Sequence, residues 1–435
     1  MTKTENKFND LGPKEWLPFQ KSFTIFENME KLIETNIDFF TKSSVKPKQI
    51  VDSIGTKEFK SLFKNKAKSL KLEYGLRSKS FDFLAVDLTG KSISLSSILK
   101  WIFIYGEKLN NRKFLWILIP TDLCYNQKIP LAWHLSNELS HFLTRKDEKI
   151  ICLPSGETWT SLYFRKDEIS KLKHTKSLTD YISYDKNKSI SKSNWFILKP
   201  KPRSSDEILH PAKYPEELVK KYLKKFTKIG DIVFDPMSGT GTTQVSSLEL
   251  DRKTFGIELS TLFHKIAIDR CTRLNSKIKW KIYQGDARHF ESFQIPNLDY
   301  IITSPPYWDM LNMKGAEIQA SRRAKGLNTN YSNDKNDLGN INNYNDFLKN
   351  LIDIFNKICL KLKNNGYLTI IVKNIKKKGI YYPLAFDLTQ SLNKSLEFKH
   401  VGFWCQNDHQ IAPYGYKQTW VSNTFHHYCI TFKKV

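Results

Sequence analysis

The second half of the chain alternates between short apolar runs that suit buried strands and longer stretches with helical spacing. Strands are expected at residues 231–234, 254–257, 279–283, 300–303, 367–372, 400–404 and 427–432. Helices are expected at residues 242–250, 262–274 and 347–362, with Gly366 ending the last of them. This alternation predicts an α/β fold whose mostly parallel, seven-stranded sheet is covered by helices on both faces.

The first half of the chain has a different pattern. Residues 1–190 mix aromatic runs with lysine clusters and predict an N-terminal α+β domain. The polar stretch at residues 177–193 leads into the proline-broken segment Lys199–Arg203, which favours an extended linker. We therefore expect an accessory domain at residues 1–190 and a second domain at residues 195–435.

Charge narrows the class of partner. The chain has 69 basic and 44 acidic side chains, and its net charge of +25 divides evenly, with +12 in residues 1–200 and +13 in residues 201–435. Such an excess favours a polyanion as partner, either nucleic acid or an anionic membrane surface.

Other bulk features of the sequence bear on location and metal binding. No apolar run reaches bilayer length, and the N-terminus lacks the apolar segment of a signal peptide. Six widely spaced cysteines suit core thiols in a reducing cytoplasm, and no metal site is expected.

Three acids end three successive strands of the second half. The first strand runs into Asp235-Pro-Met-Ser-Gly-Thr-Gly-Thr-Thr243, where Gly239 and Gly241 would let the backbone approach a ligand closely. Glu258 ends the second strand and is placed to accept ribose hydroxyls. Asp286 follows the third strand and could accept from an adenine amino group. Together these residues predict an adenosine-type ligand, since a lone Gly-x-Gly turn would be common in a purely structural role.

The fourth strand ends in Thr303-Ser-Pro-Pro-Tyr-Trp308. Pro305 and Pro306 fix the backbone and remove two amide donors, so carbonyls here can accept from an exocyclic amino group. Tyr307 would offer a ring face on which a flipped base can stack. Alone, the segment could be a rigid turn with a core tyrosine; after the three acids, a site is the favoured interpretation.

These segments resemble the DNA amino-methyltransferases that use S-adenosylmethionine on exocyclic amines. His210-Pro-Ala-Lys-Tyr-Pro-Glu-Glu217 resembles motif ten of that family, Asp235–Thr243 motif one and Ser304–Tyr307 motif four. The order ten, one, four is that of the family's gamma group, and the likeness covers residues 195–435. The resemblance implies a Rossmann-like methyltransferase fold. Met237 departs from the family, which usually has Phe there.

The resemblance also implies roles. Tyr214 and the motif-one residues would hold the methionine end of the cofactor, Glu258 its ribose and Asp286 its adenine. Ser304, Pro305, Pro306 and Tyr307 would hold the target amino group and base. The motif-one residues in this assignment are Asp235, Pro236, Met237, Gly239, Gly241, Thr242 and Thr243.

The implied reaction is methyl transfer to an exocyclic amine of a flipped base in double-stranded DNA. In the family, serine before Pro-Pro-Tyr goes mostly with N4 of cytosine, so the resemblance favours cytosine. N6-adenine methylation, RNA base methylation and a catalytically silent binding module remain alternatives. A cytoplasmic bacterial, archaeal or phage protein is expected, in a restriction–modification or host-protection system with a cognate restriction endonuclease as a further partner.

The location of sequence recognition has two candidates. Residues 1–190 are one, as a DNA target-recognition domain. The polar loop at residues 309–343 is the other, because long loops beside catalytic motifs are usually functional. Arg322, Arg323 and Lys325 in that loop, with Trp308 before it, are the candidate DNA-binding residues.

Overall fold

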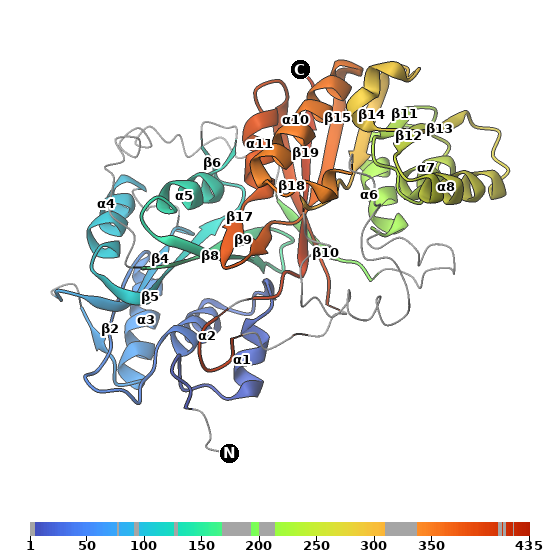
Figure 1. The fold of residues 1–435 in the computed structure, drawn as a ribbon. Coiled ribbons are helices and arrows are strands. Elements are labelled where there is room, and N and C mark those ends of the chain that lie inside the picture. Colours follow the sequence, from blue (N-terminus) through green and yellow to red (C-terminus); the bar gives the residue numbers. More distant parts are fainter. Residues whose placement is uncertain are drawn as a thin grey trace. The chain divides into compact units, whose positions relative to one another are not determined.

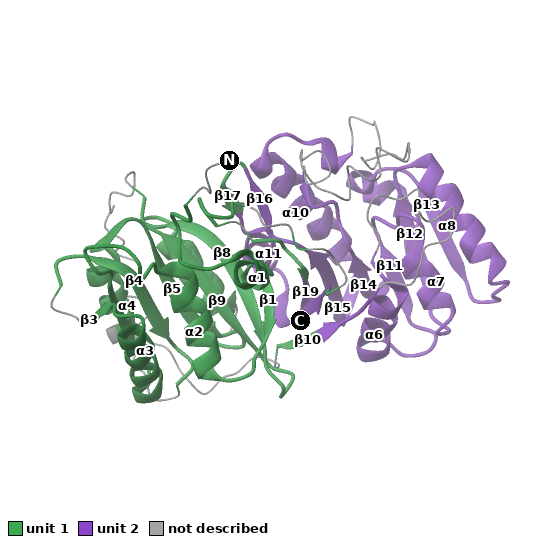
Figure 2. Cartoon of the chain, turned by 90° about the horizontal axis from the view of Figure 1, so that it is seen from below, with its two compact units in different colours: residues 1–195, 378–381, 407–426 green, residues 196–377, 382–406, 427–435 purple. Residues whose placement is uncertain are grey.

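The computed structural model divides into two compact units. It describes residues 5–75, 78–90, 95–125, 129–167, 193–199, 214–308, 337–407, 411, 415–420 and 422–435. Unit 1 comprises Met1–Trp195, Lys378–Tyr381 and Asn407–His426, and unit 2 comprises Phe196–Lys377, Tyr382–Gln406 and His427–Val435. Figure 1 labels the elements, and Figure 2 colours the two units. In the described residues, we find no helix with the length and apolarity that crossing a membrane requires.

Unit 2 contains the alternating strands and helices expected from the sequence. Its strands are β11 (Ile232–Asp235), β12 (Lys253–Glu258), β13 (Trp280–Gln284), β14 (Leu298–Thr303), β15 (Leu362–Val372), β18 (Glu397–Cys405) and β19 (His426–Lys433). Its helices are α6 (Glu216–Phe226), α7 (Thr242–Leu248), α8 (Thr261–Arg273), α10 (Tyr344–Leu360) and α11 (Leu384–Leu392), with 3-10 turns η3 (Ala287–Ser292) and η5 (Leu338–Asn340).

The sheet of unit 2 has the order β10-β18-β19-β15-β14-β11-β12-β13. The short strand β10 (Asn194–Ile197) extends the seven expected strands at one edge. Strands β15, β14, β11, β12 and β13 pair in parallel, and β19 pairs antiparallel with β15. The predicted α/β, Rossmann-like, mostly parallel sheet is confirmed by this pairing.

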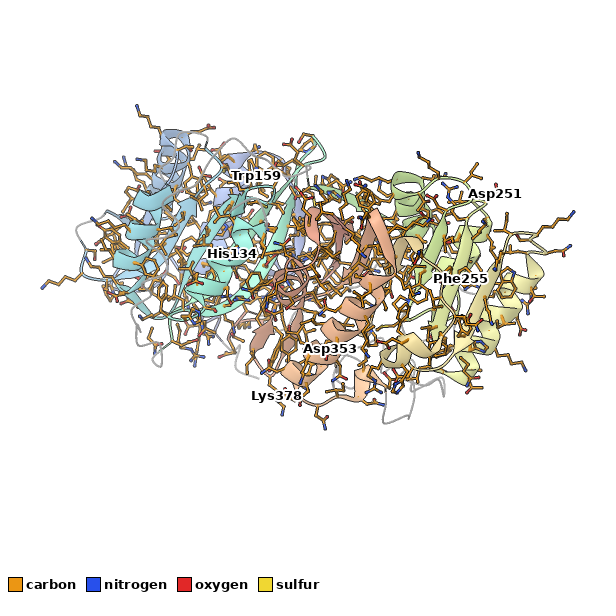
Figure 3. All side chains as sticks on the ribbon, turned by 90° about the horizontal axis from the view of Figure 1, so that it is seen from above. His134, Trp159, Asp251, Phe255, Asp353 and Lys378 are labelled. Atoms are coloured by element: carbon orange, nitrogen blue, oxygen red, sulfur yellow. The ribbon has the colours of Figure 1, made fainter. Side chains whose placement is uncertain are left out.

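Helices cover both faces of this sheet. On β11, Val233 packs in a cluster with Leu218 and Leu223 of α6, while the neighbouring Phe234 packs against Phe290 of η3 on the opposite side. Successive side chains of a strand point to opposite faces, so both faces are buried. Phe255 of β12 is likewise buried in this sheet (Figure 3).

The prediction that Gly366 ends the long helix is wrong. Helix α10 ends at Leu360, and Gly366 lies inside β15. A Cβ atom at Gly366 would lie 2.8 Å from Leu362 Cδ1 and 3.0 Å from the carbonyl oxygen of Asp299. The glycine therefore lets β15 approach β14 closely, at the place where the register of the two strands shifts.

Unit 1 is built around a second sheet. Its strands are β1 (Phe23–Ile25), β2 (Ile50–Ile54), β3 (Glu73–Tyr74), β4 (Phe81–Asp87), β5 (Leu109–Pro120), β8 (Thr144–Cys152) and β9 (Thr158–Arg165). Its helices are α1 (Pro13–Phe19), α2 (Met29–Phe40), α3 (Lys57–Ser69), α4 (Leu95–Gly106) and α5 (Leu131–Leu139). Outside the two main sheets, the described residues also form the strand pairs β6 (Cys124–Tyr125) with β7 (Ile129–Pro130) and β16 (Ile375–Lys377) with β17 (Ile380–Tyr382).

The sheet of unit 1 has the order β1-β8-β9-β5-β4-β2-β3. Strands β3, β2, β4 and β5 pair in parallel, and β9 pairs antiparallel with both β5 and β8. One apolar cluster joins α1, α2 and α3 to one face, and a second joins α4 and α5 to the other. Unit 1 thus also has a sheet between two helical layers.

A distant segment of the chain completes the core of unit 1. Trp420 is buried, with its ring 5.0 Å from that of Tyr163 and 5.5 Å from that of Phe19. The Asn423 amide donates to the carbonyl of Gln20 at 2.7 Å. The sequence pattern places this segment in the second domain, at residues 195–435, whereas in the structure its partners lie in unit 1.

Candidate active site

The acids selected from the sequence gather at one edge of the unit 2 sheet. Asp235 and Glu258 are the last residues of β11 and β12, and Asp286 follows β13 closely. Ser304 directly follows β14. Because these four strands run in parallel, their carboxyl ends lie at the same edge.

Asp235 is the centre of a buried hydrogen-bond cluster. Its Oδ2 accepts from the Tyr214 hydroxyl at 2.8 Å and from the Thr243 hydroxyl at 2.6 Å. Its Oδ1 accepts from the Met237 amide at 3.0 Å. Burial raises the pKa of this carboxyl, although the hydrogen bonds oppose the shift. The cluster joins Tyr214, from the motif-ten segment, to both ends of the motif-one loop.

The motif-one loop depends on its glycines. Gly239 and Gly241 have φ values of 53° and 80°, in the left-handed region that disfavours other residues. A Cβ atom at Gly241 would lie 2.9 Å from Cβ of Ala267 in α8, so the loop packs directly on that helix. Thr242 then begins α7, all of whose residues are buried. This tight strand-to-helix turn, with Pro236 in it, is of the kind that brings backbone amides to a ligand.

Glu258 faces the same loop. Its Oε2 accepts from the Gly239 amide at 2.7 Å, and its Oε1 from the Ser260 amide at 2.8 Å. Burial raises the pKa of Glu258 to about 8, and the nearby Asp337 adds to the shift. Two buried carboxylates beside a glycine turn suit the hydroxyl and amino groups of an adenosine-type ligand, so the residues present fit such a group.

Asp286 has a partner of its own. Its Oδ2 accepts from Arg288 Nη2 at 2.6 Å and Nε at 2.9 Å, and its Oδ1 accepts from the Arg288 amide at 2.9 Å. The carboxylate is thus held at the start of η3 by a charge-assisted pair. An adenine amino group at this position would share Asp286 with Arg288.

The Ser304–Tyr307 segment forms a compact turn. The Ser304 and Tyr307 hydroxyls lie 2.8 Å apart, and Pro305 is buried between them in the chain. Burial raises the pKa of Tyr307, which therefore stays neutral. The Tyr307 ring lies 6.0 Å from that of His427, which stacks at 4.1 Å on Trp404. Together these rings form an aromatic wall beside the turn, while Ser304 and Pro306 keep part of their surface exposed.

The candidate DNA-binding residues are placed only in part. Trp308 is 4% exposed and has a φ of 50°. Its indole donates to the Ile341 carbonyl at 2.9 Å, and its ring lies 4.8 Å from that of Tyr382. The surroundings of Trp308 indicate a packing role, and its DNA contact stays a prediction. Arg322, Arg323 and Lys325 lie outside the described residues.

Sequence reasoning missed several residues of this edge. Asp337 begins η5, and its charge raises the pKa of Glu258. Lys373 follows β15, and its ammonium lies 3.4 Å from the side-chain oxygen of Gln406, which follows β18. Burial lowers the pKa of Lys373 to about 8. For Lys373 the available signal was a polar residue at the end of a parallel strand, as it was for Glu258.

Comparison with known proteins shows similarity to DNA methyltransferases. A family model described as DNA methylase, for N6 and N4 methyltransferases, matches residues 92–269. The type II methyltransferase M2.DpnII of Streptococcus pneumoniae is 28% identical over 180 residues, which cover 39% of this chain and 65% of that protein. The type II methyltransferase M.MjaI of Methanocaldococcus jannaschii is 33% identical over 103 residues, covering 22% and 33% of the two chains.

These matches are partial. The chain spans less than two thirds of the length of both relatives. The family match includes Tyr214, the motif-one loop and Glu258, and it ends before Asp286 and Ser304. Among solved structures, TrmN of Thermus thermophilus aligns over 93% of this chain and 78% of its own, at 10% identity and a TM-score of 0.35, a likeness too low to bear on function. The similarity to DNA amino-methyltransferases is confirmed, and the matches do not separate cytosine-N4 from adenine-N6 enzymes.

Proposed function

We propose that this protein is an S-adenosylmethionine-dependent DNA amino-methyltransferase that modifies N4 of cytosine in double-stranded DNA. The observation that carries the proposal is the convergence of two groups at one sheet edge. One is the Tyr214–Asp235–Thr243 cluster with Glu258, and the other is the Ser304–Tyr307 turn. The first suits a nucleoside cofactor and the second an extruded base.

The roles of the residues follow from their positions. The motif-one loop, Tyr214 and Glu258 would hold S-adenosylmethionine, which supplies an electrophilic methyl group on its sulfonium. Tyr307 would stack on the flipped base and Ser304 would position its amino group. The Pro305 carbonyl would accept from that group and aim the nitrogen lone pair at the methyl carbon. When bound, the cofactor would supply the methyl group and leave as its thioether, and the proton lost by the methylated amine would pass to water.

The choice of base is the finer part of the proposal. Support for cytosine comes from Ser304, because serine in this position accompanies N4-cytosine in the family that the motifs resemble. Adenine-N6 methylation is the second candidate, because the matching family model covers enzymes of both kinds.

The further parts of the system are also proposals. A type II restriction–modification or host-protection role is supported by the names of the relatives, and a cognate restriction endonuclease would then share the DNA site. Because its proposed substrate is genomic DNA, such an enzyme would act in the compartment that holds the genome. Residues 1–190 are proposed as the module that helps to select the DNA target, and their charge excess supports binding to a polyanion.

One experiment tests activity and base together. Purified protein would be incubated with labelled S-adenosylmethionine and either unmodified DNA or RNA, and the nucleosides analysed by mass spectrometry. We expect N4-methylcytosine from DNA. N6-methyladenine would replace the cytosine assignment, label in RNA alone would overturn the DNA substrate, and no transfer would contradict the proposed activity. A Tyr307→Ala variant prepared in parallel controls for contaminating enzymes.

A further inference from the structure

The two sheets follow the same plan. Reading from β1 in unit 1 and from β10 in unit 2, the orders are β1-β8-β9-β5-β4-β2-β3 and β10-β18-β19-β15-β14-β11-β12-β13. Each strand of unit 1 has a counterpart at the same place in unit 2 and in the same chain order. The antiparallel strands β9 and β19 hold equivalent positions beside β5 and β15. Only β13 has no counterpart.

The connections and layers agree as well. Helix α3 links β2 to β3 as α7 links β11 to β12, and α4 links β4 to β5 as α10 links β14 to β15. A small hairpin and then a helix, α5 or α11, follow β5 in unit 1 and β15 in unit 2. Phe59 of α3 and Ile102 of α4 lie in different core clusters, on opposite faces of the sheet. In unit 2, Leu218 of α6 and Phe290 of η3 likewise pack on opposite faces.

The family comparison supports the relation independently. The DNA methylase model matches residues 92–269, a range that includes α4, β5, α5, β8 and β9 of unit 1 as well as α6, β11, α7, β12 and α8 of unit 2. More than half of the matched range, residues 92–195, therefore lies in unit 1. Unit 1 is methyltransferase-like in sequence as well as in topology.

The edge of unit 1 that corresponds to the active site is closed. Two residues, Gly55 and Thr56, join β2 to α3, whereas Pro236–Gly241 join β11 to α7. A Cβ atom at Gly55 would lie 2.6 Å from Cβ of Asp87, the last residue of β4. The Asp87 carboxylate accepts from the hydroxyls of Thr56 at 3.1 Å and Thr89 at 2.6 Å. The short turn after β2 therefore packs directly on the end of β4, in the place where unit 2 has the six-residue glycine loop.

The ribose-binding acid is also missing from unit 1. Strand β3 ends at Tyr74, whose hydroxyl lies 3.2 Å from that of Ser53, whereas β12 ends at Glu258. Only residues 75–80 separate β3 from β4, which is too short for a further helix and strand. In unit 2 the corresponding stretch, residues 259–297, contains α8 and β13.

The absence of that stretch leaves α3 uncovered. In unit 2, α7 packs between α6 and α8 and is fully buried (Figure 1). In unit 1, the outer face of α3 instead carries the exposed residues Lys57, Lys60, Lys64 and Lys68, at helical spacing. We call these four residues the α3 lysine row. Lysine is a point charge suited to phosphate, and a row of lysines without arginine suits a grip on the nucleic-acid backbone that does not read bases.

We infer that unit 1 is a methyltransferase-type module without a cofactor site, and that its α3 lysine row binds the phosphate backbone of duplex DNA. The inference rests on the proposed function. It assigns one cofactor to each chain, bound by unit 2. It gives unit 1 a DNA-binding role that is independent of methyl transfer.

Calorimetric titration of the full chain with S-adenosylmethionine tests the first part. At pH 9, where Glu258 is ionised, we expect one site per wild-type chain and at least tenfold weaker binding by Glu258→Gln. Two sites in the wild type, or one unaltered site in Glu258→Gln, would overturn the closed edge of unit 1. No binding to the wild type would contradict the proposed function itself, and the inference with it.

The salt dependence of DNA binding tests the second part. Replacing the α3 lysine row with glutamine should reduce the slope of log K against log salt by up to about 3.6, at about 0.9 for each phosphate that is no longer neutralised. The matched control replaces four other exposed lysines of unit 1, Lys14, Lys31, Lys46 and Lys48, with glutamine. An equal slope in both variants would overturn the role of α3. Unchanged cofactor titration in both variants would show that unit 2 stays folded, and circular dichroism checks unit 1.

Discussion

Asp235 in unit 2 and Asp87 in unit 1 are both fully buried carboxyls at the ends of central parallel strands, yet they do opposite things. Asp235 accepts from Tyr214, Met237 and Thr243 and so shapes a six-residue turn beside β11. Asp87 accepts from Thr56 and Thr89 and ties a two-residue turn to the neighbouring strand. The comparison teaches that the length of the turn after β2 or β11 decides whether this edge opens as a site or closes as core.

The largest loss of activity is expected when an aromatic ring is removed from the sheet edge of unit 2 that carries the candidate site. Tyr307→Ala should lower kcat by about 100-fold, because it removes both base stacking and the hydrogen bond to Ser304. Cofactor affinity should change little. Methyl transfer to DNA and cofactor calorimetry measure the two effects. Thr89→Ala, after the equivalent strand of unit 1, is the control and should keep full activity; wild-type turnover by Tyr307→Ala would remove the stacking role.

Glu258, which has no equivalent in unit 1, should make cofactor binding depend on pH. Its pKa is raised to about 8, and only its carboxylate form accepts from two ribose hydroxyls. Affinity should therefore rise between pH 6.5 and pH 9 in the wild type. Glu258→Gln should bind about 10- to 100-fold more weakly at pH 9, with a flat profile. Calorimetry across this range measures both, and an equally steep profile in the variant would assign the titration to another group.

The same raised pKa has a consequence for stability. A carboxyl whose pKa is higher in the folded than in the unfolded state favours folding while it is protonated. Its contribution is complete below pH 4.5 and disappears as the pH rises through about 8. In the absence of cofactor, Glu258→Gln should lack this part of the decline in stability towards alkaline pH, which denaturant titrations at pH 6 and pH 9 would show.

The sequence was sufficient for the parts of unit 2 that depend on local pattern. Each expected strand of its sheet is present within a few residues, because buried parallel strands give continuous apolar runs. The position of the candidate site residues at one sheet edge also followed from topology, since parallel strands bring their carboxyl ends together. Gly366 was misread because a glycine after a helical pattern can equally lie in a strand that approaches its neighbour closely.

Long-range contacts explain what the sequence did not reveal. Trp420 completes the core of unit 1, although some 250 residues of sequence separate it from β9, the last strand of that sheet along the chain. No local pattern indicates such a contact. Likewise, the arginine that holds Asp286 is two residues away, yet its bidentate geometry depends on the turn at η3. The turn sequences that mark a methyltransferase are absent from unit 1, so its likeness to unit 2 shows in the strand order and in the range of the family match.

Two glycines allow the open and closed turns to be compared directly. Gly241→Ala places a Cβ 2.9 Å from Ala267 at a φ of 80°, and Gly55→Ala places one 2.6 Å from Asp87 at a φ of 153°. Each should destabilise its unit by about 1–3 kcal/mol. Only Gly241→Ala should also weaken cofactor binding, by about tenfold. Thermal unfolding and calorimetry separate the effects, and weaker cofactor binding by Gly55→Ala would contradict the assignment of one site per chain.

The smallest effect is expected at Asp286, whose carboxylate already accepts hydrogen bonds from Arg288. Asp286 is held by Arg288, so an adenine amino group gains only part of the carboxylate, and Asp286→Asn should weaken cofactor binding by no more than about tenfold. Arg288→Ala removes the competing donor but also the group that fixes the carboxylate in place, and the two changes oppose each other. Its affinity should therefore stay within about threefold of the wild type. Calorimetry of both variants measures this, and a weaker affinity for Arg288→Ala than for Asp286→Asn would mean that the arginine itself contacts the cofactor.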